Sequence, residues 1–179
     1  MRLNRAAIEA RLPHRGTMCL LDEVLDWQAN SIRCRTSTHL QPGNPLRGPQ
    51  GLGIACGIEY AAQAMALHAA LVSTDGRPSA NGERRLPAGA LAAVREVRMS
   101  RRWLDGGDRG DRGDRGDGSD GSDGSGNAGS DLIIEADLLA GDADRALYAF
   151  NVSNGAGPLL SGRATVVLNL AAEQGAARR

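Results

Sequence analysis

The stretch "NPLRGPQGLGIACGIEYAAQAMALHAAL" (residues 44–71) decides the fold of this chain. Gly51, Gly53 and Gly57 lead into a run made almost wholly of Ala, Met, Leu and Ile, which predicts one long helix over residues 53–73. A helix that is apolar on nearly every side is normally buried. We therefore expect the rest of the domain to enclose it.

Two polar side chains interrupt this apolar helix. Glu59 lies in its first turns, and Gln63 follows at i+4 on the same face. A carboxylate in an enclosed setting loses solvation and is a candidate acid or base. The alternative is that Glu59 only complements the helix macrodipole. The glycines are open to two interpretations as well, close backbone approach to a ligand or a tight loop.

The segments around the helix predict strands. Asn4 is suited to cap a short helix over residues 5–12. Alternating or apolar runs predict strands over 18–27, 31–37, 90–103, 131–139, 145–153 and 159–170, with a hairpin turn at Ala29–Asn30. Runs of strands beside a single long helix predict an α+β fold with an antiparallel sheet, the last strands forming a meander.

Residues 105–130 differ from the rest of the chain. This stretch consists of Gly, Asp, Ser and Arg with almost nothing that can pack, which predicts a disordered, low-complexity insert within a single domain spanning 1–179. We expect it to be an overgrown loop between two adjacent strands, where added length costs little. It lacks the recurring aliphatic residue of calcium-binding glycine repeats and the terminal Glu of an EF-hand, so no metal site is predicted.

Composition excludes several classes of protein. The formal net charge is zero, which disfavours a nucleic-acid binder held by bulk electrostatics. The chain has no Lys, which excludes Schiff-base chemistry through Lys. Cys19, Cys34 and Cys56 are widely spaced, as expected for reduced thiols in a cytoplasmic protein. No signal peptide and no membrane span are predicted.

Two motifs together carry a family resemblance. "LPHRGTMCLLDEVLDW" (12–27) and "GIEYAAQAMALHAAL" (57–71) resemble the hotdog-fold 3-hydroxyacyl-[acyl carrier protein] dehydratases, and most closely the branch associated with aryl-polyene pigment gene clusters. The Leu-Pro-His-Arg opening places His14, and the helical Glu and Gln of the family correspond to Glu59 and Gln63. The resemblance extends over about residues 10–100.

The resemblance implies a fold, a substrate and a set of roles. The sheet would wrap around the helix, and a homodimer or heterodimer with another hotdog dehydratase would hold its active sites at the interface. The substrate would be a thioester on the phosphopantetheine arm of an acyl carrier protein, with no further cofactor. Glu59 would help expel the 3-hydroxyl as water, Gln63 would orient Glu59, amides near Gly57 would hold the thioester carbonyl, and His14 would lie near the substrate.

The chain departs from the family at the catalytic histidine. The usual motif places this His 14 residues before the Glu, where this chain has Pro45. His39 lies 20 residues before Glu59 and is either the displaced base or a solvent-facing loop residue. His68 lies on the opposite side of the helix from Glu59 and is expected to be a helix-end residue.

Two other functions therefore stay open beside the dehydratase. The missing His is consistent with a non-catalytic subunit paired with a true dehydratase. A hotdog acyl thioesterase, whose carboxylate would activate water, is the other alternative. The arginines at 95, 98, 101 and 102 either receive an acidic carrier protein or form a solvated strand face.

Overall fold

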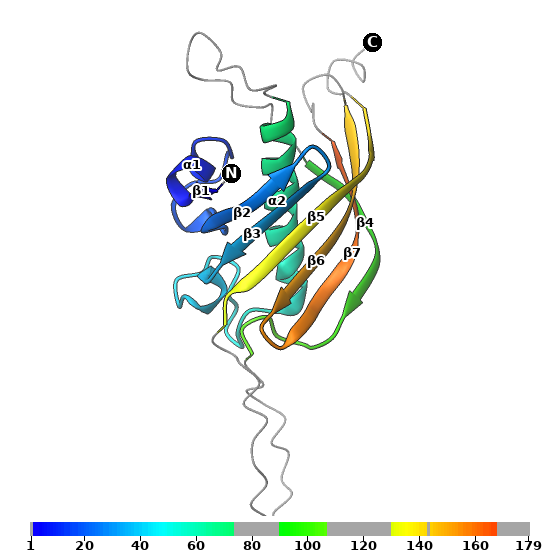
Figure 1. Ribbon diagram of the computed structural model, residues 1–179. Helices are drawn as coiled ribbons and strands as arrows, with labels where there is room; N and C mark the ends of the chain where they lie inside the picture. Colours follow the sequence, from blue (N-terminus) through cyan, green and yellow to red (C-terminus); the bar gives the residue numbers. More distant parts are fainter. Residues whose placement is uncertain (1, 74–89, 107–129, 143, 168–179) are drawn as a thin grey trace, which may run out of the picture.

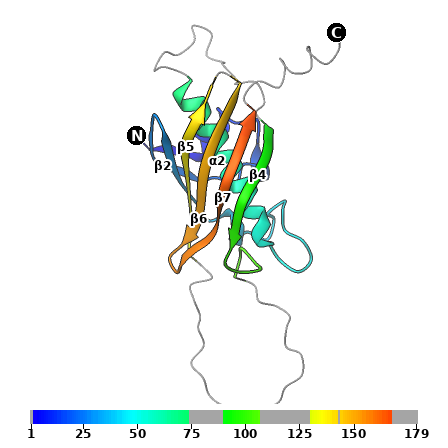
Figure 2. The same ribbon diagram turned by 90° about the vertical axis from the view of Figure 1, so that its right-hand side faces the viewer.

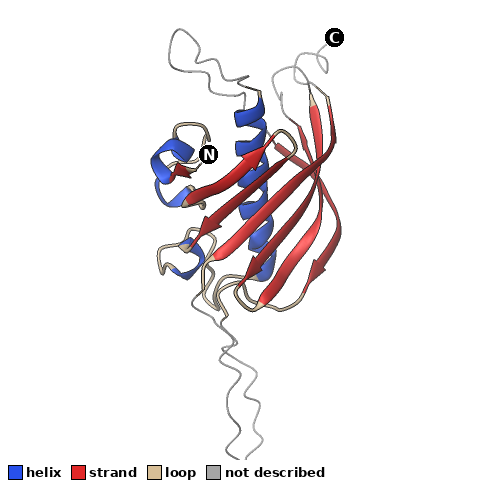
Figure 3. Cartoon of the chain, in the orientation of Figure 1, coloured by secondary structure: helices blue, strands red, loops and turns tan. Residues whose placement is uncertain are grey.

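One antiparallel sheet curls around one long helix in the computed structural model (Figures 1 and 3). The structure describes residues 2–73, 90–106, 130–142 and 144–167. Its helices are α1 (Arg5–Glu9) and α2 (Gly57–Val72), with short 3-10 turns η1 (Gly16–Met18), η2 (Thr38–Leu40) and η3 (Ile54–Cys56). Its strands are β1 (Leu3–Asn4), β2 (Glu23–Gln28), β3 (Ser31–Thr36), β4 (Ala90–Met99), β5 (Leu132–Gly141), β6 (Arg145–Asn154) and β7 (Gly157–Val167). The expected α+β fold is confirmed.

The strands lie in the order β1-β2-β3-β5-β6-β7-β4, and all neighbours are antiparallel. The predicted meander holds for β5, β6 and β7, but β4 crosses to the far edge and pairs with β7 (Figure 2). The expectation that the insert joins two adjacent strands is therefore wrong, because β6 and β7 separate β4 from β5. Most of the predicted insert at 105–130 lies outside the described residues.

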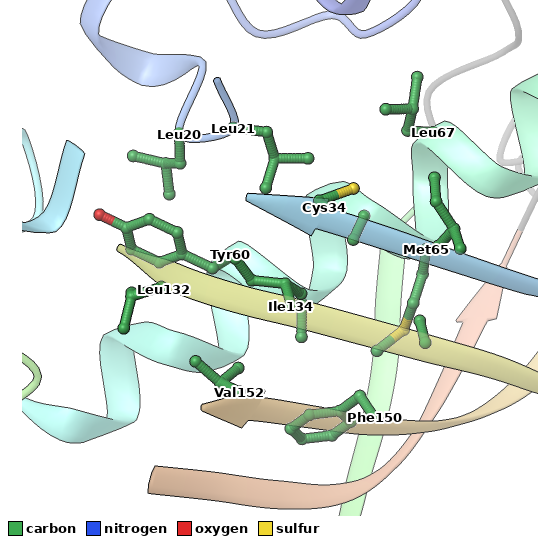
Figure 4. Close-up of a cluster of buried hydrophobic side chains, with 14 of the residues drawn as sticks. Leu20, Leu21, Cys34, Tyr60, Met65, Leu67, Leu132, Ile134, Phe150 and Val152 are labelled. Carbon is green, nitrogen blue, oxygen red and sulfur yellow. The ribbon is translucent and has the colours of Figure 1, made fainter. Parts of the chain in front are cut away.

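The core lies between α2 and the concave face of the sheet. Tyr60, Met65 and Leu67 from α2 meet Ile134 of β5 and Phe150 of β6, and all five side chains are buried (Figure 4). The helical stretch Ile54–Val72 is long and apolar enough by composition to cross a membrane, but 67% of its most apolar window is buried inside the fold. It is thus the core helix that the sequence predicts.

The segment before β2 does not form the predicted strand. The strand expected over 18–27 begins only at Glu23, and residues 16–18 form the turn η1. The backbone groups of Met18, Cys19 and Leu20 are bonded to side chains of other elements instead of a neighbouring strand. These contacts place the segment against the start of α2.

Other local predictions are confirmed. The Asn4 side chain accepts a hydrogen bond from the Ala7 amide at 3.0 Å and caps α1. Ile32 and Cys34 point into the core of the β2–β3 hairpin, whereas the arginines between and after them are exposed. Cys19, Cys34 and Cys56 are free thiols.

Candidate active site

Glu59 occupies the first turn of α2 and meets two of the residues that the sequence singles out. Its Oε1 lies 3.1 Å from Gln63 Nε2 and 3.5 Å from His14 Nε2. The Glu59 side chain keeps 36% of its surface exposed, so the carboxylate is less enclosed than the apolar helix suggests. The structure therefore brings together Glu59, Gln63 and His14, from two motifs far apart in the sequence.

Gln63 is the fixed centre of this group, with only 1% of its surface exposed. Its Oε1 accepts from the Leu20 amide at 2.9 Å, and its Nε2 donates to the Met18 carbonyl at 2.9 Å and to Glu59. The Leu20 amide can only donate, so the amide oxygen must face it and Nε2 must face the other two groups. Gln63 thus holds Glu59 as an acceptor at Oε1.

Arg5 fixes the loop that carries His14. Its guanidinium donates to the carbonyls of Gly16 at 2.9 Å and Cys19 at 2.6 Å, and to Asp22 Oδ1 at 2.8 Å. Leu12, on the other side of His14, is buried at 1% exposure and anchors the loop in the core. A charged donor with three acceptors is a strong local constraint.

Arg15 adds a second clamp to the same loop. Its Nη1 donates to the carbonyls of Glu9 and Leu12 and, at 3.0 Å, to that of His14. These are carbonyls at and just past the end of α1, which the helix itself leaves unpaired. The Leu-Pro-His-Arg motif therefore has a physical role: Leu12 anchors it, Arg15 closes it, and His14 is presented to Glu59.

The position of the His14 ring indicates where its proton lies. His14 Nδ1 is buried and has no hydrogen-bond partner among the residues that the structure describes, while Nε2 faces the Glu59 carboxylate. A hydrogen on Nδ1 would be a buried donor without an acceptor, which is costly. We therefore assign the neutral ring its proton on Nε2, directed at Glu59.

His39 is buried, so its interpretation as a solvent-facing residue is wrong. It lies in η2 at 1% exposure, and its backbone carbonyl accepts from Arg47 Nη2 at 2.6 Å. Its Nδ1 has no partner within the described part of the chain. Loss of solvation lowers the pKa of His39 to about 4, more than nearby acidic groups raise it. Among the described residues, no hydrogen bond or ion pair joins His39 to Glu59.

His68 lies away from Glu59, as predicted, but it is a core residue and not a helix-end residue. At 0% exposure, its Nδ1 lies 2.9 Å from the Tyr148 hydroxyl and its Nε2 lies 2.9 Å from the Gln28 carbonyl. Burial lowers the pKa of His68. This pair ties the tip of the β2–β3 hairpin and β6 to α2.

The amide of Gly57 is already used within the helical turn. It donates to the carbonyls of Ile54 and Ala55. A Cβ at Gly57 would lie 2.7 Å from Leu160 Cδ2, so this glycine allows α2 to approach β7 closely. The carbonyl of Leu52 accepts from the Leu104 amide at 2.7 Å, and Ala55, in the turn that leads into α2, is an exposed residue.

An ion pair that the sequence did not indicate closes the loop before α2. Arg47 Nη1 pairs with Asp105 Oδ2, which also accepts from the Leu52 amide at 3.2 Å. The Asp105 side chain is 9% exposed, so this first residue of the predicted insert belongs to the folded domain. Asp105 begins a Gly- and Asp-rich stretch, so the sequence alone does not distinguish it from the residues that follow.

Comparison with known proteins adds a family and a fold. A family model described as ApeP-like, ApeP dehydratase, matches residues 6–111, a range that contains His14, Glu59 and Gln63. No curated protein matches the chain.

Two of the similar solved structures align over most of the chain. The dehydratase heterocomplex ApeI:P from Xenorhabdus doucetiae aligns with a TM-score of 0.71 at 20% identity, over 96% of this chain and 97% of that chain. Zebrafish thioesterase superfamily member 2 aligns with a TM-score of 0.50 at 13% identity, over 93% of this chain and 99% of that chain. Together with the sheet wrapped around α2, these likenesses establish the hotdog fold.

Proposed function

The chain belongs to the ApeP-like dehydratase family, and from this premise we propose that it removes water from a 3-hydroxyacyl thioester carried by an acyl carrier protein. The pathway would be of the fatty-acid or aryl-polyene type. The observation that carries the proposal is the contact of Glu59 with both Gln63 and His14. It unites the two motifs of the dehydratase resemblance at one carboxylate.

Glu59 is the acid in this proposal. Its Oε1 accepts from Gln63 and faces the Nε2 proton of His14, which leaves Oε2 to carry the transferred proton. Glu59 gives that proton to the 3-hydroxyl, which leaves as water. A base removes the proton from C2, and the C–H electron pair becomes the double bond between C2 and C3. Amides near Ala55, at the start of the helical segment, would hold the thioester carbonyl in place of the Gly57 amide.

Neither His14 nor His39 is well suited to be the base that removes the C2 proton. The Nε2 proton of His14 is directed at Glu59, so that nitrogen is not free to accept another. His39 is neutral, but a pKa lowered to about 4 by burial makes it a weak base at neutral pH. We therefore propose that a second hotdog subunit supplies the base, with His39 as the alternative within this chain.

The free edge of β4 offers a place for that subunit. Within the described residues β4 pairs only with β7, and Leu91 and Met99 on it are exposed at 38% and 48%. An unpaired strand edge with exposed apolar side chains favours association with another sheet. The solved ApeI:P structure is a dehydratase heterocomplex, which supports a heteromer over a homodimer.

The carrier protein and the location complete the proposal. Arg95, Arg98 and Arg102 are exposed on and after β4, where an acidic carrier protein could dock. The phosphopantetheine arm belongs to the substrate, and no further cofactor is proposed. The free thiols are consistent with a cytoplasmic location.

The function is tested by identifying the product. The purified chain, alone and mixed with a hotdog dehydratase partner, is supplied with a 3-hydroxyacyl carrier protein and analysed by mass spectrometry. We expect loss of water from the acyl chain in the mixture and little in the chain alone.

Each other outcome has a defined meaning. Full dehydration by the chain alone would overturn the need for a partner. Release of free acid would replace the dehydratase with the thioesterase alternative. Activity of the mixture that is unchanged when this chain is omitted would show that the chain is not a dehydratase subunit.

A further inference from the structure

We propose that Asn44, Tyr60 and Thr38 form a buried hydrogen-bond chain that positions Glu59 for the reaction. The proposal rests on the proposed function and extends it from Glu59 to residues that do not touch the carboxylate. All three residues are buried, with exposures of 6%, 0% and 3%.

Hydrogen bonds connect Asn44, Tyr60 and Thr38 without a break. Asn44 Nδ2 donates to the Tyr60 hydroxyl at 2.7 Å, and that hydroxyl lies 3.2 Å from Thr38 Oγ1. Thr38 Oγ1 lies 2.7 Å from the Leu20 carbonyl. Figure 4 shows the Tyr60 ring among aliphatic side chains, with its hydroxyl on the side of Leu20.

The contacts define which groups can donate and accept. The Leu20 carbonyl can only accept, and Thr38 Oγ1 and, at 2.6 Å, Thr36 Oγ1 both lie within hydrogen-bond distance of it. The Tyr60 hydroxyl accepts from Asn44 Nδ2 and shares a hydrogen bond with Thr38 Oγ1. Burial raises the pKa of Tyr60, which keeps the phenol protonated for this role.

Leu20 connects this hydrogen-bond chain to the candidate active site. Its carbonyl accepts from Thr38, and its amide donates to Gln63, which in turn donates to Glu59. Both backbone groups of one residue are thereby fixed. A shift of Leu20 would move Gln63, and with it the carboxylate.

At its other end the hydrogen-bond chain fixes the loop around Pro45, the position that corresponds to the catalytic histidine of the typical dehydratases. Asn44 immediately precedes Pro45, donates to the Thr38 carbonyl at 2.9 Å and accepts from the Leu46 amide at 2.9 Å. The loop is therefore bound to Tyr60, the residue next to Glu59 on α2. The same bonds therefore tie this loop to the helix that carries Glu59.

The test uses a matched pair of buried tyrosines. Tyr60→Phe removes the hydroxyl from the proposed chain, and Tyr148→Phe removes one that contacts His68 elsewhere on α2. Dehydration is measured in the assembly that turns over with the wild-type chain. We expect Tyr60→Phe to lower kcat about tenfold with KM within about twofold, because a small displacement of a catalytic group has a large effect on rate. Tyr148→Phe should leave both constants close to wild type.

A spectroscopic readout separates this proposal from the proposed function. The chain has three histidines, so the His14 imidazole signal can be assigned by substitution, and the Gln63 side-chain amide likewise. In Tyr60→Phe both NMR signals should shift, and in Tyr148→Phe neither should. These shifts are measurable even if the wild-type chain performs no dehydration.

A second pair of variants, at Thr38, keeps the test valid if Tyr60→Phe does not fold. Thr38→Val removes the hydroxyl at nearly constant volume, and Thr38→Ser restores it. We expect the Val variant to reproduce the kinetic and NMR changes and the Ser variant to reverse them. Equal effects of Tyr60→Phe and Tyr148→Phe, or equal effects of Thr38→Val and Thr38→Ser, would overturn the proposal.

Discussion

At Glu59, the carboxylate oxygen Oε1 faces two protein donors, whereas no donor from the described residues is bonded to Oε2. Gln63 is buried and makes three hydrogen bonds, whereas Glu59 is over a third exposed. This division is suited to an acid that must be both oriented and accessible. A residue that only complemented the helix macrodipole would not need a buried partner.

Gln63→Leu should reduce both stability and activity. It leaves the buried Leu20 amide and the Met18 carbonyl without their partner and frees Glu59 to rotate. We expect the free energy of unfolding to fall by about 3 kcal/mol, since each unpaired group costs about 1–3 kcal/mol, and kcat to fall as well. Denaturant titration and the dehydration assay measure the two effects.

Gln41→Leu is the matched control, because that Gln is exposed and its side chain makes no hydrogen bond within the described residues. Similar losses in both variants would contradict the account of Gln63.

His39 predicts a pH dependence of stability. Its pKa in the folded chain, about 4, lies below the ordinary 6.5 that it regains on unfolding. Below about pH 6.5 the unfolded state binds a proton that the native state does not, so stability is lost as the pH falls toward 4. The full loss from this group is about 3 kcal/mol, and most of it is absent in His39→Gln.

Stability curves of both proteins between pH 7 and pH 4 test this. Carboxylates titrate in both proteins alike, so the difference between the curves isolates His39. Parallel curves would show that His39 does not carry this effect.

At the scale of elements, the site exists because the loop 12–20 is attached to the start of α2. Arg5 of α1 donates to the loop, Arg15 within the loop donates back to the Glu9 carbonyl at the end of α1, and Gln63 holds the loop from α2. The backbone of residues 18–20 in this loop bonds to these side chains instead of pairing with a neighbouring strand. Loss of the predicted strand at residues 18–22 and formation of the site have the same cause.

Gly57→Ala tests the close approach of α2 to β7. Ala favours a helix by about 1 kcal/mol over Gly, yet the added Cβ would lie 2.7 Å from Leu160 Cδ2, and Leu160 is 1% exposed. Overpacking of this kind costs about 1–3 kcal/mol, so we expect a net loss of about 1 kcal/mol in thermal or denaturant unfolding.

Gly43→Ala is the control, since a Cβ there meets nothing within 4 Å. A Gly57→Ala protein as stable as the Gly43→Ala protein would show that Leu160 yields without cost.

Local patterns were enough to predict most elements and one contact of the site. The i, i+4 spacing predicted the pairing of Glu59 with Gln63, and apolar periodicity predicted α2. The contact of His14 with Glu59 and the burial of His39 could not be predicted from local patterns, because they depend on how two irregular loops fold against the helix. The edge position of β4 likewise depends on long-range pairing with β7, which its own alternation does not encode.

At the scale of the whole molecule, the sheet formed by the described residues ends at β4, which pairs there with β7 alone. The chain carries the proposed acid, Glu59, with the residues that would position it, but within its described part no histidine suits the role of a strong base beside it. An incomplete site and an open sheet edge in one molecule favour a heteromer in which the partner completes the chemistry.

Charges at the β4 edge should block this assembly without unfolding the chain. Leu91→Glu combined with Met99→Glu changes two exposed side chains, so the melting temperature should change little. We expect the mixture with the partner subunit to sediment as separate chains in analytical ultracentrifugation. Leu139→Glu, at a residue of β5 that is 50% exposed, is the control and should leave assembly intact. Assembly that survives the double substitution would place the interface elsewhere.

The central claim is that Glu59 is the acid of a dehydration reaction, and the dehydration rate of Glu59→Gln in the complete assembly tests it most directly. Gln keeps the shape of the side chain but cannot transfer the proton, so we expect kcat to fall by about 100-fold or more while the assembly remains intact. Glu135→Gln, a carboxylate 42% exposed on β5 and paired with Arg33, should retain the wild-type rate. A Glu59→Gln assembly that dehydrates its substrate as fast as Glu135→Gln would contradict the account.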